Sequence, residues 1–205
     1  MRTVSNGVWR SLVKPAIFKL VRLDDRARTL EGGKIELRRH ARENYHLYAE
    51  WYGDPEIWHL TSWAPSPLKR SAVERLFEDR ELSRTEDSFA IHIKDEDEPI
   101  GVISLTNKSE ANESADLSVI VGHRDDRHRG YGTEAIDRLL RYAFEELGLN
   151  RIGLSVFEFN EEAISAYEKL GFVEEGRIRQ AIKRPSGFHD AILMGILKSE
   201  RGSSS

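Results

Sequence analysis

Residues 127–150, RHRGYGTEAIDRLLRYAFEELGLN, contain the clearest helix in this sequence. Between Ala135 and Leu147 the apolar side chains recur at helical spacing, as a helix with one buried face requires. Gly148 follows the last of them and is a typical helix end. We therefore predict a helix that begins near Thr133 and ends at this glycine.

The segment in front of this helix combines glycines with basic side chains. It consists of Arg127, His128, Arg129, Gly130, Tyr131 and Gly132, with Thr133 as the first helical residue. Main-chain amides in a turn between a strand and a helix converge with the positive end of the helix dipole, and glycines let a ligand approach the backbone closely. The segment therefore predicts an anion site, to which Arg127 and Arg129 add positive charge. A dinucleotide or nucleotide ligand stays open as an alternative, although the third glycine of the dinucleotide fingerprint is absent.

The rest of the chain alternates between strand and helix patterns. We predict seven strands, at Lys34–Arg38, Phe89–Ile93, Ile100–Leu105, Leu117–Val121, Ile152–Phe157, Phe172–Arg177 and Ala191–Leu197. Further helices are predicted at Arg42–Tyr52, at Ser71–Leu82 and from Asn160 to Gly171, and the region of Trp58, Trp63, Pro65 and Pro67 is predicted to be a loop. This order indicates an α+β fold of mixed αβα layering, with a mostly antiparallel central sheet of about seven strands and helices on both faces.

The composition restricts the function classes. The chain has 205 residues, 39% hydrophobic and 32% charged, which is typical of one soluble domain. The formal net charge of -4 argues against a nucleic-acid or anionic-membrane partner. The absence of cysteine excludes disulfides, thiolate metal sites and a cysteine nucleophile, and it suits the cytoplasm. No metal is expected, because His123, His128 and His189 form no ligand motif.

We divide the chain into three parts. Residues 1–33 are predicted to be an N-terminal arm that packs against the domain or a second subunit, 34–198 the folded domain, and 199–205 a disordered tail. No stretch is apolar enough for a membrane span or a secretory signal. We therefore expect a cytoplasmic monomer or homodimer.

Two motifs in sequence order resemble a known family. R-x-x-G-x-G at Arg127 to Gly132, followed by NEEAISAYEKLGF at Asn160 to Phe172, is similar to the GNAT acyl-CoA N-acyltransferases, and specifically to their RimJ/RimL-type branch. The resemblance covers residues 34–198. It implies acetyl-CoA as co-substrate, a primary amine as acceptor, and a V-shaped splay between Leu117–Val121 and Ile152–Phe157 that admits CoA.

The resemblance also implies which residues hold the cofactor. The loop amides would bind the CoA pyrophosphate, and pantetheine would pair with the strand that contains Val119, Ile120 and Val121. The remaining cofactor-binding residues are Arg127, His128, Arg129, Gly130, Tyr131, Gly132, Thr133, Asn160 and Lys169. Asn160 also has the local role of a helix cap. A core aromatic is the alternative role for Tyr167.

Direct acyl transfer needs a neutral amine, a stabilised oxyanion and a proton for the leaving thiolate. Backbone amides near Val119 to Val121 are the candidate oxyanion donors, and Tyr167 is the candidate acid. The candidate bases are Asp116 and Glu158, and either one can equally be a solvated carboxylate at a strand end. A water relay is a further alternative.

The acceptor side is less specified. We expect Trp51, Trp58, Trp63 and the Lys183 to His189 turn to gather there. By the family resemblance, a protein N-terminal α-amine is the first choice of acceptor. Polyamines, aminoglycosides, amino acids and a succinyl donor remain alternatives, and so does a non-catalytic acyl-CoA-binding module.

Overall fold

The computed structural model describes residues 29–201 of the chain. Its centre is one sheet in the order β1-β2-β3-β4-β5-β6-β8-β7, in which every neighbouring pair is antiparallel except β5 and β6. The strands are β1 (Leu30–Glu31), β2 (Ile35–Arg38), β3 (Asp87–Ile93), β4 (Pro99–Ser109), β5 (Ser114–Val121), β6 (Arg151–Phe157), β7 (Val173–Arg184) and β8 (Gly187–Leu197). The predicted α+β class is confirmed, with eight strands instead of about seven. The additional strand, β1, is only two residues long, too short for its alternation to be recognised in the sequence.

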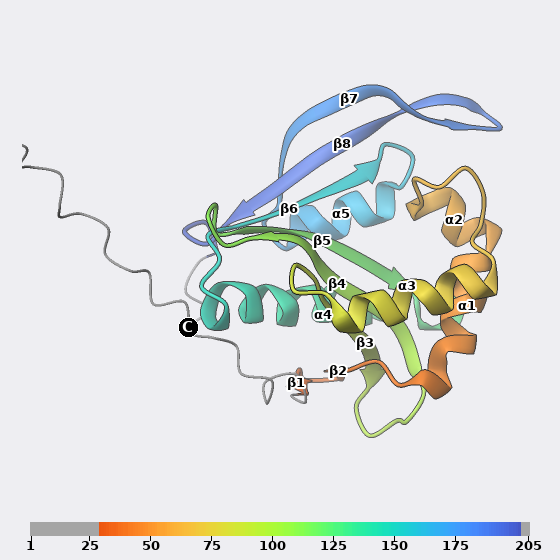
Figure 1. The fold of residues 1–205 in the computed structure, drawn as a ribbon. Coiled ribbons are helices and arrows are strands. Elements are labelled where there is room, and N and C mark those ends of the chain that lie inside the picture. Colours follow the sequence, from red (N-terminus) through yellow and green to blue (C-terminus); the bar gives the residue numbers. More distant parts are fainter. Residues whose placement is uncertain (1–28, 202–205) are drawn as a thin grey trace, which may run out of the picture.

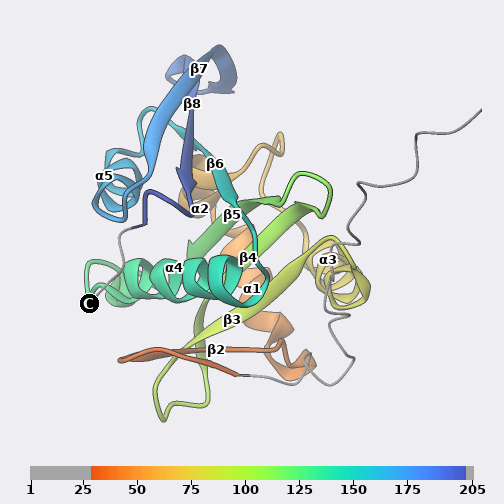
Figure 2. The same ribbon diagram turned by 90° about the vertical axis from the view of Figure 1, so that its left-hand side faces the viewer.

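Helices cover both faces of the sheet (Figures 1 and 2). They are α1 (Tyr45–Gly53), α2 (Pro55–Thr61), α3 (Arg70–Leu82), α4 (Tyr131–Arg141) and α5 (Glu161–Lys169), with a π-helical turn, η4 (Tyr142–Glu146), after α4. The helices α4 and α5 pack on one face, over a core that includes Leu139 and Ile192. The helices α1 and α3 pack on the other, over a second core around Tyr48 and Phe77.

Trp58 lies in a helix, which corrects the first part of the predicted loop, whereas Trp63, Pro65 and Pro67 lie in the irregular segment between α2 and α3. The Asp54 carboxylate accepts hydrogen bonds from the amides of Glu56 and Ile57, at 2.7 and 3.1 Å, and Pro55 occupies the first turn. These are the features of a helix start. Asp54 is also the C-terminal capping residue of α1, where its amide donates to the Trp51 carbonyl at 3.2 Å. The same Asp-Pro pair therefore ends α1 and begins α2.

The sheet opens between β5 and β6. These strands pair only from Ser114 to Asp116, and the last pair joins Asp116 to Gly153. Beyond this point β6 stays paired with β8 along its whole length, while β5 stays with β4. The predicted V-shaped splay is thereby confirmed, and it points toward α2 and the amino end of α4.

The ends of the described chain are attached to the domain. Leu30, within the segment assigned to the arm, is buried, and β1 pairs with β2. At the other end, an Arg201 guanidinium nitrogen lies 2.6 Å from a carboxylate oxygen of Asp137 on α4. Among residues 29–201, no helix has both the length and the apolar character that a bilayer crossing requires.

A buried histidine network holds the core between α1 and β3. His40 Nε2 lies 2.8 Å from Ser88 Oγ, and His40 Nδ1 lies 3.1 Å from Tyr48 Oη. The Ser88 hydroxyl extends this hydrogen-bond network to Ser104 Oγ, at 2.7 Å. Burial, with help from nearby arginines, lowers the pKa of His40 from 6.5 to about 3. The imidazole is therefore neutral in the fold.

This network predicts how stability depends on pH. The unfolded chain takes up a proton at His40 near pH 6.5 and the folded chain does so only near pH 3, so stability is present above pH 6.5 and is lost as the pH falls toward 3. His40→Gln should cost about 1–2 kcal/mol at pH 7.5 and should remove about 2 kcal/mol of the loss between pH 6.5 and 4.5. Urea unfolding at pH 7.5, 6.5 and 4.5 measures these free-energy differences. His46→Gln, at an exposed position of α1, is the control. A His40→Gln protein with the wild-type pH slope would contradict the prediction.

Candidate active site

A cavity of about 480 Å³ lies beside the carboxyl half of β5. Its walls come from β5, the loop before α4, the first turn of α4, the length of α5 and one face of α2. Of the residues predicted from the sequence, those that line it are Val119, Ile120, Val121, Arg127, His128, Gly130, Tyr131, Gly132, Thr133, Asn160, Tyr167 and Lys169. Arg129, Asp116 and Glu158 are not part of the lining.

The amino end of α4 opens into this cavity without a capping side chain. Gly130 is the N-cap residue, with φ of 84°, a conformation that costs a residue with a Cβ about 1–2 kcal/mol. Within residues 29–201, no side chain accepts a hydrogen bond from the first amides of the helix. Gly132 packs closely, since a Cβ there would lie 3.2 Å from Val121 Cγ2. The loop thus presents unpaired amides and a positive helix end to the cavity.

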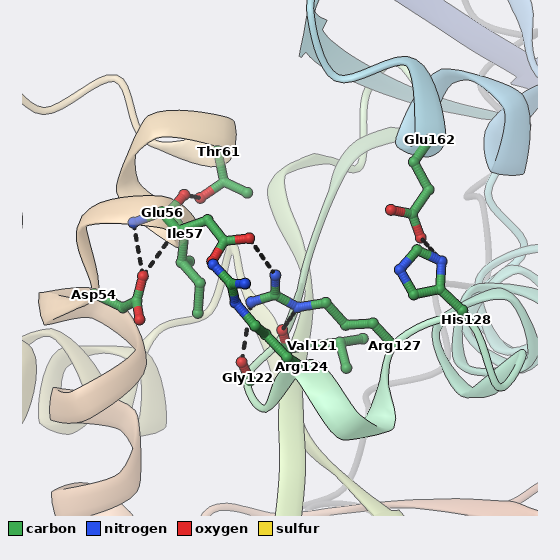
Figure 3. Close-up of polar contacts among 10 residues, drawn as sticks. All are labelled: Asp54, Glu56, Ile57, Thr61, Val121, Gly122, Arg124, Arg127, His128 and Glu162. Carbon is green, nitrogen blue, oxygen red and sulfur yellow. Dashed lines mark hydrogen bonds and ion pairs between the residues drawn. The ribbon is translucent and has the colours of Figure 1, made fainter.

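Arg127 lines the cavity, but its guanidinium is engaged in hydrogen bonds within the protein (Figure 3). Its guanidinium donates to the carbonyls of Val121 and Gly122, at 3.3 and 3.1 Å, and to the Glu56 carboxylate of α2 at 3.1 Å. Arg124 also pairs with Glu56. The guanidinium predicted to supplement the anion site is therefore used to join the loop to α2 and to the end of β5.

Arg129 is turned out of the cavity. Its guanidinium lies 3.6 Å from the Asp126 carboxylate and stacks over the Tyr131 ring at 5.2 Å. His128 does face the cavity, and its Nδ1 lies 3.1 Å from the Glu162 carboxylate on α5, as Figure 3 shows. This contact closes the loop against α5.

Asn160 holds two helices at once. Its Oδ1 accepts from the amide of Ala163 at 3.3 Å and caps α5, while its Nδ2 donates to the carbonyl of Leu60 on α2 at 3.3 Å. Both ends of the side-chain amide are used within the protein. Lys169, at the other end of α5, makes no ion pair within the described chain, so its ammonium group is available to a phosphate.

Tyr167 lies on the cavity wall with a buried ring and a free hydroxyl. The residue is 9% exposed, and its ring meets Phe172 edge-on at 5.7 Å. Within residues 29–201 the hydroxyl has no hydrogen-bond partner. Burial raises the pKa of Tyr167 to about 12. The side chain is therefore a neutral acid at physiological pH, with its proton available to a ligand in the cavity.

The two candidate bases lie elsewhere. Asp116 is exposed at the apex of the splay, where its Oδ2 accepts from Asn107 Nδ2 at 2.9 Å. Glu158 is drawn toward the last hairpin, because its Oε1 accepts from the Asp190 amide at 3.1 Å and lies 3.3 Å from His189 Nδ1. The structure does not bring either carboxylate to the cavity beside Tyr167.

The predicted acceptor residues gather only in part. Trp58 stacks with Arg184 of the last hairpin, and Trp63 meets Phe157 edge-on at 5.1 Å. Trp51 is instead buried in the core, so close to Gly122 that a Cβ there would overlap the indole ring. Trp51 therefore supports the turn at the end of β5 from behind.

Sequence reasoning missed the α2 wall of the cavity. Ile57, Leu60 and Thr61 line it, although the segment was predicted to be a loop. The available signal was Asp54-Pro55-Glu56, a cap residue followed by proline and an acidic residue at helix-start spacing. Glu56 contacts Arg127, and Arg184 binds carbonyls at the end of α2. Both contacts join residues far apart in the sequence, so no local pattern predicts them.

Comparison with known proteins agrees with this architecture. A family model described as the acetyltransferase (GNAT) domain matches residues 34–173. The "Uncharacterized N-acetyltransferase p20" of Bacillus licheniformis is 27% identical over 175 residues, which are 84% of this chain and 97% of that protein. The spermidine N(1)-acetyltransferase of Vibrio cholerae is 25% identical over 173 residues, covering 84% of this chain and 92% of that protein.

The fold is also found among solved structures. The Vibrio cholerae spermidine N-acetyltransferase, in complex with CoA and spermine, superposes with a TM-score of 0.75 at 24% identity, over 83% of this chain and 99% of that one. With the family model matched over more than half of its length, this chain belongs to the GNAT acetyltransferase family and is an acyl-CoA N-acyltransferase whose co-substrate is acetyl-CoA.

Proposed function

We propose that this enzyme acetylates α-amines at protein N-termini, as a RimJ/RimL-type member of its family acting in the cytoplasm. The lining of the cavity carries the choice of acceptor. Its only carboxylates within the described chain, Asp126 and Glu162, are both paired, with Arg129 and His128 respectively. The cavity therefore offers no free carboxylate base.

An acceptor that loses its proton readily fits such a site best. An α-amine has a pKa of about 7.7–8.0, so a substantial fraction is neutral near pH 7.5, whereas a lysine-type amine with a pKa of about 10.4 is almost fully protonated. Without a free carboxylate base in the cavity, the α-amine can enter already neutral or lose its proton to water. This difference favours N-terminal acceptors over long-chain amines.

The reaction then needs three contributions from the protein. Amides at the amino end of α4 and Lys169 hold the CoA phosphates, and the end of β5 lies beside the acyl group. The amine nitrogen attacks the thioester carbonyl carbon, and backbone amides near Val119 to Val121 stabilise the oxyanion. As the carbon–sulfur bond breaks, Tyr167 gives its proton to the sulfur, and the proton released by the nitrogen restores the tyrosine.

A polyamine acceptor is the second candidate. It is favoured by the two Vibrio cholerae comparisons, since those proteins are named as spermidine acetyltransferases. Polyamines carry several ammonium groups, which call for carboxylates along the path of the chain. Glu158 and Asp190, joined by a hydrogen bond from the Asp190 amide to the Glu158 carboxylate beside the last hairpin, are candidate carboxylates outside the cavity lining.

A panel of amines distinguishes the two candidates. Purified protein is mixed with acetyl-CoA and with either a peptide bearing a free N-terminus, its N-acetylated counterpart that keeps one lysine, or spermidine, while free thiol is followed. We expect kcat/KM for the free N-terminus to exceed that for each of the others by about 100-fold or more. Faster turnover of spermidine would contradict the α-amine proposal.

The loop geometry predicts an effect of Gly130→Ala on CoA binding. The alanine would be strained at φ of 84° and would displace the amides of the first α4 turn. We expect the Kd for CoA, measured by calorimetry, to rise about 10-fold. Gly148→Ala is the matched control, because Gly148 has φ of 73° and equally open space but lies outside the cavity. It should lower Tm similarly and leave the Kd unchanged. Equal Kd values for the two variants would refute the role of the loop.

The proton role of Tyr167 predicts a loss in kcat. Tyr167→Phe removes only the hydroxyl, so kcat should fall about 100-fold while KM for acetyl-CoA stays within about two-fold. Because its pKa is raised to about 12, the acid form is present at all lower pH values, and wild-type kcat should not fall through tyrosine ionisation up to pH 10. Tyr142→Phe, remote from the cavity, is the control. Unchanged turnover in Tyr167→Phe would remove this residue from the mechanism.

A further inference from the structure

Arg184 is the one buried residue of strand β7. It is 4% exposed at the tip of a hairpin whose other β7 residues are exposed or half-buried. Its Nε donates to the carbonyl of His59 at 3.1 Å, and its Nη2 donates to the carbonyls of Trp58 at 3.2 Å and Ser62 at 2.7 Å. The guanidinium therefore caps the carboxyl end of α2.

The environment of this arginine is unusual for a buried cation. No carboxylate lies within ion-pair distance of Arg184 in the described chain, so the helix carbonyls balance its charge. The guanidinium is stacked between the rings of Trp58, at 4.3 Å, and Phe157, at 5.1 Å. A planar group with several fixed donors suits three carbonyls and two aromatic faces at once, which a lysine cannot match.

Another face of α2 forms the cavity wall. Ile57, Leu60 and Thr61 line the cavity, while Trp58 meets Arg184 of the hairpin. Thus α2, a helix of only seven residues, lies between the hairpin and the cavity. A short helix has little stability of its own, so its position depends on contacts at its ends.

The two ends of α2 are held by different partners. At the amino end, Glu56 pairs with Arg127 of the loop before α4. At the carboxyl end, Asn160 binds the carbonyl of Leu60 and Arg184 binds the carbonyl of Ser62. Loss of the carboxyl-end contact leaves the loop and its contact with Glu56 in place. The effect of Arg184 should therefore fall on the acceptor and spare CoA.

We propose that Arg184 is a positioning residue that fixes α2 as the acceptor-side wall of the cavity and thereby sets acceptor selectivity. This inference rests on the proposed function, because it requires an amine that passes α2 to reach the thioester. Arg184 itself touches no reacting atom. It acts through the placement of Ile57, Leu60 and Thr61.

The test compares Arg184→Met and Arg184→Lys with Arg179→Met. The methionine keeps an apolar stem beside the two rings, and the lysine keeps the positive charge without the planar guanidinium. Arg179, an exposed residue of the same strand, provides the control. Steady-state kinetics are measured with acetyl-CoA and with two acceptors, a peptide bearing a free N-terminus and spermidine. Hydrogen exchange of the amides of residues 56–62 reports directly on α2.

We expect both Arg184 variants to raise the acceptor KM about 10-fold and to change the peptide-to-spermidine ratio of kcat/KM by a similar factor. The Kd for CoA should stay within about two-fold, which also shows that the variants are folded. Exchange should accelerate in residues 56–62 and not in α4. Arg179→Met should match the wild type in every respect.

Two results would overturn the proposal in distinguishable ways. If the wild type acetylates the peptide N-terminus faster than spermidine, and the Arg184 variants change the KM for the acceptor and the KM for acetyl-CoA together or change neither, the inference on Arg184 is wrong and the proposed function stands. If the wild type binds CoA but acetylates neither amine, the proposed function fails, and the role of Arg184 in acceptor selection fails with it.

Discussion

The structure depends on main-chain amides at the amino end of α4 that have no partner among residues 29–201. Gly130 turns the chain there with a positive φ, and no described side chain caps the helix. Unpaired amides at the end of a helix dipole attract an anion, and they open into the cavity. Each remaining feature of the site serves to keep these amides, β5 and Tyr167 in one geometry.

Three polar contacts close a ring around the cavity. Glu56 with Arg127 joins α2 to the loop, His128 with Glu162 joins the loop to α5, and the Asn160 amide joins α5 to α2. The splay of β5 from β6 makes space for a ligand, since a continued ladder would fill it. These contacts join the elements around the opening, where strand pairing is missing. Arg184 extends this support to the last hairpin.

Local patterns predicted much of this arrangement. The periodicity from Ala135 to Leu147 predicted the helix, and the last part of this segment is the π-helical turn η4. Most of the predicted cofactor-binding residues line one cavity, because the fold brings together the end of β5, the loop before α4 and helix α5. Asn160 proved to cap α5, as its position predicted.

The remaining features depend on contacts between distant segments. Whether Arg127 faces an anion or Glu56 is decided across 71 positions of sequence, and the contact from Arg184 to Ser62 spans 122. Asp54-Pro55 has two local meanings, helix end and helix start, and both occur here. The Glu158 carboxylate is held at the last hairpin, away from the cavity, by a contact that its local sequence does not predict. Side-chain roles of this kind follow from tertiary packing.

A crystal structure of the protein with CoA tests the central claim most directly. The account predicts that the pyrophosphate oxygens accept hydrogen bonds from main-chain amides of the loop and the first turn of α4, between Arg129 and Thr133. It also predicts that the CoA sulfur lies within hydrogen-bond reach of the Tyr167 hydroxyl. CoA bound at another surface, or a pyrophosphate held by side chains away from these amides, would contradict it.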